Sequence, residues 1–591
     1  MKLRHVVPLL ALALSACATS APRDPAPSPD VAPLFAQFWD EYLTLYPLQA
    51  TFVGDARFND RLPNGLTDAY RARERDFNTR WLARIRSVDT AGLSAQDRLS
   101  VDIFVRAREE ELQRLEYPEH LIPLNQFYSF ANIFAQLGSG TSAQPFATVA
   151  DYDAWLVRMA RLPGLFDQAI VNMREGAGRD LVQPRALIDK VLPQLDALIH
   201  DDPQQTLFWQ PVAHMPDTIP PTDRERLQAA YAEAIDTQVM PAYRRLRDFV
   251  RDEHLPQTRE THGMRDLPGG EDWYAYYVRR YTTTDLTPEQ IHRIGLDEVA
   301  RIHGEMRRVI AELGFDDDLQ AFFTFLTTDP QFQFDSEEDL LARYNALRER
   351  VEAGAAKLFS MTPKAPFEIR PVEAFRARSA AGGSYMRPSE DGSRPGVFYV
   401  NTYDLPSRKT WDMEDLFLHE AIPGHHFQLA LQQELDGIPA FRRFGSFTAY
   451  IEGWGLYAES LGKELGVYTD PYMYFGYLQN ELWRAIRLVV DTGLHAKGWT
   501  REQVIDYMLA NSAESETQAI AEAERYMAIP GQATAYKIGE LRIKALRAKA
   551  EDALGDDFDI RAFHAEVLKD GAVPLDVLEA KIERWIAAQA R

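Results

Sequence analysis

The sequence predicts a mainly α-helical protein, one large bilobed unit with a small β-sheet near its functional site. The helical pattern runs from about residue 34 almost to the C-terminus. Helix starts marked by capping residues recur along it, and only residues 366–401 have β-type composition. The 591 residues are 46% hydrophobic, so the chain is long and apolar enough to bury a large core.

The first 17 residues predict a lipoprotein signal peptide. Lys2 and Arg4 precede an apolar run, residues 6–14, that is too short to span a bilayer. The run ends in Leu-Ser-Ala-Cys, which resembles a lipobox, so we expect lipidation of Cys17, the only cysteine. In such lipoproteins a residue other than Asp after the cysteine, here Ala18, implies the outer membrane, facing the periplasm of a Gram-negative bacterium. A plain secretory signal is the alternative.

Residues 18–33 predict an extended tether before a helical body at 34–591. Residues 20–33 contain five prolines, which a helix or a central strand does not accept. No other segment is apolar enough to span a membrane, so we expect attachment through the lipid alone. The formal charge of −23 repels phosphate backbones and disfavours nucleic acid as a partner.

Three helix starts are marked most sharply. Thr287 combines an N-cap hydroxyl with Pro288 and with Gln290 in the capping-box position. Asp470 before a proline opens a second long helix, and Thr500 with a Gln three residues on opens a third. Residues 366–370 and 396–401 are the candidate strands, just before the segment that carries the chemistry.

Residues 419–426 read His-Glu-Ala-Ile-Pro-Gly-His-His. The usual zinc-peptidase motif, H-E-x-x-H, places two histidines four residues apart on one helix face, with the Glu as general base. Here His419 and His425 are six residues apart. That spacing is about 600° on an ideal helix, so the two imidazoles would point about 120° apart.

Pro423 and Gly424 allow the distortion that a shared metal ion requires. Pro423 has no N–H, so the carbonyl of His419 loses its helical partner there. Gly424 can adopt backbone angles closed to other residues. A bulge or break would bring His425 back toward His419, and His426, one residue further round, is the less favoured ligand. A histidine cluster without chemical role is the alternative.

Glu452 is the candidate third ligand, because catalytic zinc sites use three protein groups and keep a position for water. It lies 27 residues after His425, which suits a second helix returning to the site. Gly453 and Gly455 cost that helix about 1 kcal/mol each, which close approach of another backbone would explain. Glu459 shares the face of Glu452 and is expected to orient a histidine. A solvated glutamate is the alternative for Glu452.

Four motifs together resemble the bacterial family known as domain of unknown function 885. They are residues 394–401 (Arg-Pro-Gly-Val-Phe-Tyr-Val-Asn), 419–426, 452–459 (Glu-Gly-Trp-Gly-Leu-Tyr-Ala-Glu) and 530–537 (Pro-Gly-Gln-Ala-Thr-Ala-Tyr-Lys). The stretch from Gly269 through the helix opening at Thr287 is similar as well, so the likeness covers roughly residues 34–591.

That family is regarded as zinc metallopeptidases similar to the helical gluzincins, such as neurolysin. The resemblance implies a zincin-like fold, one Zn²⁺ ion and peptide substrates. Those relatives have a Gly directly before their second zinc histidine, and matching it to Gly424 selects His425. Dipeptidyl peptidase III, whose spacing is one residue longer than usual, indicates that the motif tolerates insertion.

The expected reaction is hydrolysis by a metal-bound water. Glu420 would deprotonate that water and pass the proton to the leaving amine. The oxyanion needs a second donor, for which Tyr536 is the first candidate and Tyr526 and His495 are others. Ordinary packing is the alternative for each tyrosine.

Arg484, Arg487, Asp491 and His495 form one polar row, because steps of three, four and four keep to one helix face. As the wall of a groove, the two arginines would hold a substrate carboxylate in a bidentate fork. Cleavage near a peptide C-terminus would follow. A surface row with internal ion pairs is the alternative.

Tyr399 and Asn401 lie on the second candidate strand, which by analogy with zinc peptidases would pair with an extended peptide by edge addition. Short peptides are the expected substrates, because the helical relatives enclose their site in a deep channel. A zinc amidase or esterase stays open, since the attacking water is the same. So does a non-catalytic metal-binding envelope lipoprotein, although Glu420 argues against it. The sequence does not indicate an oligomeric state.

Overall fold

Helices make up almost all of the regular structure. A computed structural model describes residues 30–127, 129–316, 318–372, 377, 381–388 and 394–590. Within them lies a single three-stranded sheet, so the predicted class, mainly α with a small sheet, is confirmed. The predicted signal peptide (1–17), the predicted lipidation site Cys17 and residues 18–29 of the predicted tether lie outside the described residues. The first helix begins at Ala32, two residues before the predicted body, because Pro33 fits the first turn of a helix.

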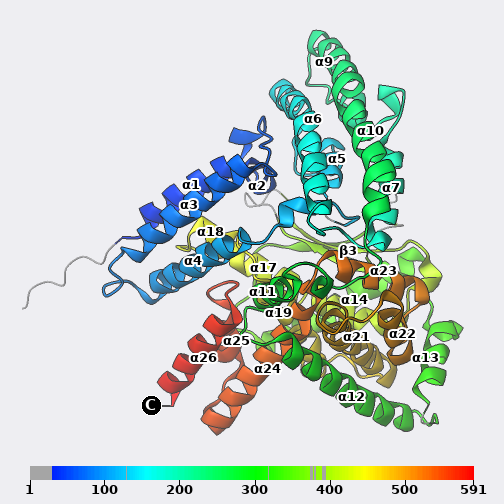
Figure 1. Cartoon of the computed structure of the whole chain (residues 1–591). Helices are drawn as coiled ribbons and strands as arrows, with labels where there is room; N and C mark the ends of the chain where they lie inside the picture. The colour runs from blue at the N-terminus through cyan, green and yellow to red at the C-terminus, as the bar shows by residue number, and fades with distance from the viewer. Residues whose placement is uncertain are drawn as a thin grey trace, which may run out of the picture.

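The N-terminal helices form a small layered unit at one side of the molecule (Figure 1). They are α1 (Ala32–Leu45), α2 (Pro47–Phe52), α3 (Asp68–Arg86) and α4 (Ala95–Arg114). Aromatic side chains dominate their core, where Phe38 meets Phe104 and Trp81 edge to face. Phe441, from a distant part of the chain, completes this core and ties the unit to the body.

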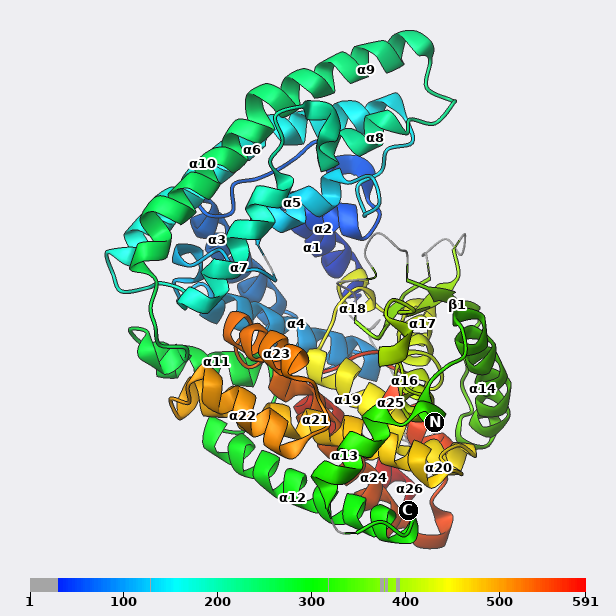
Figure 2. The ribbon, with the colours of Figure 1, turned by 90° about the vertical axis from the view of Figure 1, so that its right-hand side faces the viewer.

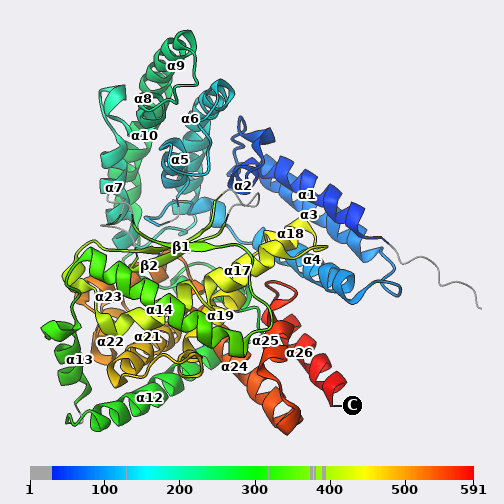
Figure 3. The same ribbon diagram turned by 180° about the vertical axis from the view of Figure 1, so that it is seen from behind.

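The next helices form a lobe that stands away from the rest of the protein (Figures 1 and 3). They are α5 (Phe130–Gly138), α6 (Val149–Ala177), α7 (Arg185–Leu198), α8 (Gln210–Ala213), α9 (Pro221–Ala234) and α10 (Met240–Phe249). The lobe has a hydrophobic core of its own, separate from that of the body. Helix α7 contacts α23 (Glu516–Ala528) of the body (Figure 2).

The body holds the largest core and all of the predicted site. Its helices are α11 (Gly270–Thr282), α12 (Pro288–Glu312), α13 (Leu319–Thr328), α14 (Glu337–Leu358), α16 (Met413–Glu420), α17 (His425–Glu434), α18 (Ala440–Arg443), α19 (Thr448–Ser460), α20 (Gly462–Leu465), α21 (Pro471–Ala496), α22 (Arg501–Asn511), α23 (Glu516–Ala528), α24 (Ala535–Leu554), α25 (Ile560–Leu568) and α26 (Leu575–Gln589). Helix α12 packs along α21, and α19 packs along α24.

The three helix starts predicted from capping residues are confirmed. Thr287 accepts from the backbone N–H of Gln290, whose side chain accepts from the N–H of Thr287 in return. Asp470 caps α21, and Thr500 caps α22 with a second capping box.

The sheet has the order β1-β3-β2, with β1 (Phe367–Pro371), β2 (Gly383–Met386) and β3 (Gly396–Val400). β1 and β3 are the two predicted strands, and they pair in parallel; β2 pairs with β3 in antiparallel orientation. Phe398 of β3 meets Phe417 of α16, so the sheet packs against the helix that carries His419.

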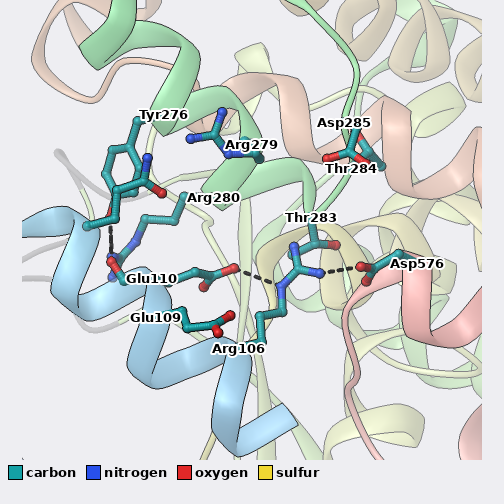
Figure 4. Close-up of a pocket in the computed structure, with 11 residues that line it drawn as sticks. Arg106, Glu109, Glu110, Tyr276, Arg279, Arg280, Thr283, Thr284, Asp285 and Asp576 are labelled. Atoms are coloured by element: carbon teal, nitrogen blue, oxygen red, sulfur yellow. Dashed lines mark hydrogen bonds and ion pairs between the residues drawn. The ribbon is translucent and has the colours of Figure 1, made fainter. Parts of the chain in front are cut away.

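A cavity of about 280 Å³ lies between α4, α11 and the start of α26 (Figure 4). Arg106 crosses it to reach Glu110 and Asp576, at 2.8 Å and 2.5 Å. These contacts join the N-terminal unit to the C-terminal helix. Among the described helices, none is both long and apolar enough to cross a membrane.

Candidate metal centre

The helix that carries His419 breaks where the sequence predicts it. Helix α16 ends at Glu420 and α17 begins at His425. Gly424 is required for space, because an added Cβ would collide with the carbonyl oxygen of His419. The indole N–H of Trp454 donates to the carbonyl oxygen of Pro423 at 2.8 Å, so α19 holds the broken segment from the side.

The break brings the three predicted ligands together. One ligand atom each of His419, His425 and Glu452 lies within 4.8 Å of the others. Glu452 Oε2 is 3.5 Å from Nε2 of His419 and 3.6 Å from Nε2 of His425. The centroids of the two imidazole rings are 4.5 Å apart, and the ring planes are inclined by 77°.

Glu459 holds His419 from the opposite side. Its Oε1 lies 2.6 Å from Nδ1 of His419, and both side chains are buried. Because a carboxylate accepts, Nδ1 carries a proton, and Nε2 is the nitrogen that faces Glu452. Gly455 makes room for this ring, since an added Cβ would lie 2.7 Å from Cε1 of His419. Gly453 instead faces the backbone of Gly539, so only this glycine serves the predicted helix-to-helix approach.

The site is arranged to hold positive charge. Burial lowers the pKa of His419, but Glu452 and Glu459 outweigh burial and raise it to about 10. Burial raises the pKa of Glu452, yet its two histidine partners bring it well below its ordinary value. Two imidazole nitrogens and one carboxylate oxygen are a ligand set of catalytic zinc sites. The residues present therefore fit one zinc ion.

Arg484 contacts Glu459, the carboxylate that holds His419. Its Nη1 donates to the backbone and side-chain oxygens of Asn480, and its Nη2 lies 3.8 Å from Oε1 of Glu459. The charge of Arg484 also lowers the pKa of Asp415, which burial raises well above its ordinary value. Arg484 therefore compensates buried acids, and its predicted role as a substrate ligand stays a prediction.

His426 is turned toward the sheet. Its Nδ1 lies 2.8 Å from the hydroxyl of Tyr385, and its ring packs against Phe367. Burial lowers its pKa to about 4. Of the two neighbouring histidines, His425 is thus the one that faces His419 and Glu452.

The carboxylate of Glu420 remains available at the edge of the site. Glu420 is 9% exposed, and its carboxylate forms neither a hydrogen bond nor an ion pair with any described residue. It directly follows His419, and its charge acts on that ring. A carboxylate in this position can accept a proton from a molecule held beside the ligands.

Tyr536 lies close to the ligands, whereas Tyr526 is already engaged. Burial raises the pKa of Tyr536, and the charge of Glu452 raises it further. The guanidinium of Arg487 stacks on the Tyr536 ring, 4.8 Å from its centroid. The hydroxyl of Tyr526 donates to Glu522 at 2.6 Å and accepts from Arg487, so Tyr536 is the better placed donor.

A family model described as "Bacterial protein of unknown function (DUF885)" matches residues 47–582. The chain belongs to this family. Its structure is similar to the crystal structure of a candidate lipoprotein from Colwellia psychrerythraea, with 28% identity and a TM-score of 0.87, over 94% of this chain and 99% of that one. It also resembles the structure of a candidate lipoprotein of unknown function from Shewanella oneidensis. There the identity is 19% and the TM-score 0.73, again over 94% and 99% of the two chains, so that likeness concerns the fold alone. No curated protein matches the sequence.

In this DUF885 protein, the C-terminal half of the polar row on α21 supports the backbone. His495 accepts from the N–H of Met264 at Nδ1 and donates from Nε2 to the carbonyl of Tyr526. Burial lowers its pKa to about 3. Both ring nitrogens are thus used by the backbone, so His495 is not an oxyanion donor in this geometry. Asp491 accepts from the N–H of Gly531, and the row is interior instead of exposed.

The predicted peptide-binding strand is not an edge. β3 pairs with β1 on one side and with β2 on the other, so edge addition at Tyr399 or Asn401 is wrong. Asn401 is buried and donates to the carbonyl of Ala377. Tyr399 is nearly buried beside Val397.

Sequence reasoning missed two residues that shape the DUF885 site. Trp454 reads as part of a core stripe, and nothing in its spacing indicates that its N–H reaches Pro423. Arg525 lies on α23, away from the polar row of α21, yet it donates to the same Glu522 carboxylate as Arg487. Arg525 is the only arginine between Arg501 and Arg542, five residues before the Pro530 motif, and no local pattern points to it.

Proposed function

We propose that this DUF885 protein is a zinc-dependent hydrolase whose substrates are short peptides. One observation carries the proposal: ligand atoms of His419, His425 and Glu452 lie within 4.8 Å of one another, while Glu420, next to His419 in the chain, has no hydrogen bond or ion pair among the described residues. Three protein ligands and a neighbouring general base are what metal-assisted hydrolysis requires.

The chain's own residues have separate tasks in this reaction. A bound zinc ion would supply Lewis acidity to a water molecule and to the scissile carbonyl. Glu420 accepts the proton of the attacking water and returns it to the leaving amine. The hydroxyl of Tyr536 donates to the oxygen on which negative charge develops. Glu459 keeps His419 in the tautomer that turns Nε2 toward the other ligands.

A zinc amidase or esterase uses the same residues on another bond, and only substrate trials separate it from a peptidase. A metal-binding lipoprotein without turnover needs no base. Glu420, buried and without a structural partner among the described residues, favours an enzyme over that alternative.

We also propose that the protein is lipid-anchored at the cell envelope through Cys17. The apolar run of residues 6–14 and the Leu-Ser-Ala-Cys sequence support this, as do relatives described as candidate lipoproteins. Ala18 favours the outer membrane, on its periplasmic side. Cys17→Ser should move the protein from the membrane fraction to the soluble fraction after cell breakage. A variant that stays with the membrane would contradict the anchor.

The decisive test of the hydrolase is a metal analysis together with a peptide library read by mass spectrometry. The purified protein should carry one zinc per chain and cleave a subset of the peptides. Glu420→Gln should keep the zinc and lose at least about 100-fold in kcat, because the general base is gone. Glu464→Gln, at the end of α20 and paired with Arg547, is the control and should keep full activity. Zinc-free protein without cleavage would contradict the proposal, and an active Glu420→Gln would contradict the assignment of the base.

A further inference from the structure

Two helices bring a pair of arginines together beside Tyr536. Arg487 of α21 donates from Nε to the hydroxyl of Tyr526 and from Nη2 to Oε2 of Glu522, at 3.2 and 3.1 Å. Arg525 of α23 donates from Nη1 to both oxygens of the same Glu522 carboxylate. One carboxylate is therefore shared by two guanidinium groups.

This cluster carries more positive than negative charge. Both guanidinium groups stay protonated, and Glu522 is their only ion-pair partner among the described residues. Burial raises the pKa of Asp491 and of Glu514 to about 7, so neither nearby acid supplies a full negative charge at neutral pH. Charges that are mostly removed from water are stabilised by an opposite charge in direct contact. A second carboxylate would balance the pair.

Tyr536 is influenced both by the arginine pair and by Glu452, one of the candidate metal ligands. It lies in the first turn of α24, which packs along α19, the helix that carries Glu452. The charge of Glu452 raises the pKa of the phenol, which burial also raises, while the charges of Arg487 and Arg525 lower it. Tyr536 is thus within electrostatic reach of Glu452 and of both arginines.

The pair is also reachable from solvent. The side chain of Arg487 is 11% exposed and that of Arg525 is 20% exposed. Nη2 of Arg525 also donates to Gln532 at 2.6 Å, so among the described residues Nη1 of Arg487 and Nε of Arg525 are the nitrogens left without a hydrogen bond. Arg484, the other arginine of the row on α21, already contacts Asn480 and Glu459.

We propose that Arg487 and Arg525 bind a carboxylate of the substrate, and that this carboxylate is the C-terminal one of a short peptide. The proposal rests on the hydrolase function above and narrows it to removal of residues from peptide C-termini. The C–N bond before the released residue breaks, the water oxygen bonds to the carbonyl carbon, and a water proton passes to the released amine. Guanidinium groups hold both oxygens of a planar carboxylate, which fixes the distance from the chain end to the bond that is cut.

An acidic side chain of the substrate also offers a carboxylate. Three peptides distinguish a side-chain carboxylate from the C-terminal one. The first has a free C-terminal carboxylate, the second is its C-terminal amide, and the third is an amide whose last residue is Glu. We expect amidation to lower kcat/KM about 10- to 150-fold, the range for losing hydrogen bonds to a charged group. Recovery of cleavage with the third peptide would overturn the C-terminal assignment. Equal cleavage of all three would overturn the inference and leave the hydrolase intact.

Binding tests the inference without turnover. Zinc-loaded Glu420→Gln is titrated with the free-acid peptide and with its amide by calorimetry. The free acid should bind tighter by about the same factor as the kinetic preference. If no peptide is cleaved by the wild type, the hydrolase proposal fails, and this titration still decides whether the arginine pair recognises a carboxylate. Equal affinity for acid and amide would overturn that recognition.

Variants of the cluster assign the effect to it. Arg525→Gln should bring the ratio of kcat/KM for acid over amide close to one, and Glu522→Gln should increase it, because a competing carboxylate is neutralised. Arg547→Gln is the matched control: its side chain is also 20% exposed, on α24, but it pairs with Glu464. It should keep the wild-type ratio. An unchanged ratio in Arg525→Gln, with an unchanged circular dichroism spectrum, would overturn the assignment.

Discussion

The Nδ1 nitrogen of His419 lies 2.6 Å from Oε1 of Glu459, on the helix that also carries Glu452. One helix, α19, thus supplies a candidate ligand and, two turns further on, the carboxylate that orients another ligand. Both contacts are fixed by the α19 backbone, so any shift of this helix moves them together. The buried setting of Glu459 keeps the pair out of competition with water.

Glu459→Gln should weaken zinc binding about 10- to 100-fold, because carboxylates behind zinc histidines raise the basicity of the ligand and fix its tautomer. The amide keeps the shape of the side chain but loses its charge. The measurement is the zinc dissociation constant of the metal-free protein in competition with a chelating dye. Glu464→Gln, an exposed glutamate on the next helix, should leave that constant unchanged. Wild-type affinity in Glu459→Gln would mean that the contact does not tune the site.

Gly455→Ala and Gly453→Ala should fail in different ways, although the two glycines are two residues apart. An added Cβ at Gly455 would lie 2.7 Å from the ring of His419, so zinc affinity should fall, with a smaller loss of stability. At Gly453 the new Cβ would lie 2.5 Å from the backbone of Gly539 and force α19 away from α24. Its main effect should be a lower melting temperature, measured by calorimetry on metal-free protein. Equal effects of both substitutions on affinity and stability would contradict these separate roles.

The candidate ligands could be predicted because the spacing of the two histidines departs from the usual motif in a way that has a clear structural meaning. Two histidines six residues apart demand a break, and Pro423 and Gly424 stand where a break must occur. The choice of His425 over His426 came from the resemblance to relatives, and the geometry supports it independently. Glu459 follows from helical periodicity alone, because seven residues keep one face.

Other features depend on what packs against a face, which periodicity does not reveal. Arg484, Arg487 and His495 share a side of α21 as predicted, yet they contact three different partners, namely Glu459, Glu522 and the carbonyl oxygen of Tyr526. The position of β3 in the middle of the sheet depends on β2, a short strand without β-type composition. Long-range packing, not local preference, decides both cases.

Trp454→Phe should loosen the segment between α16 and α17. The phenyl ring fills most of the buried space but cannot donate to the carbonyl of Pro423, which is buried as well. An unpaired buried acceptor costs about 1–3 kcal/mol of unfolding free energy. We expect a lower melting temperature and, because His425 follows this segment directly, a weaker zinc affinity. Trp499→Phe, an indole change away from the ligands, is the control for stability alone. A wild-type zinc affinity in Trp454→Phe would show that the segment holds its shape without this hydrogen bond.

Asp491→Asn should change how stability depends on pH. Burial raises the pKa of Asp491 from 3.8 to about 7, against hydrogen bonds from Tyr274 and Gly531 and the charge of Arg525, which lower it. Between pH 4 and pH 7 the unfolded chain has released this proton while the folded protein keeps it. The folded state then binds more protons, so the free energy of unfolding falls as the pH rises through this window.

Asparagine keeps an oxygen for both donors and has no proton to lose, so the variant should lack this decline. Relative to wild type, it should gain up to about 4 kcal/mol between pH 4 and pH 7.5, from roughly three pKa units at 1.4 kcal/mol each. The measurement is the difference in melting temperature between variant and wild type at each pH, with Asp506→Asn, an exposed position on α22, as the control. A difference that stays constant across this range would mean that Asp491 is ionised in the folded protein, and that the backbone at Gly531 is held by a charge.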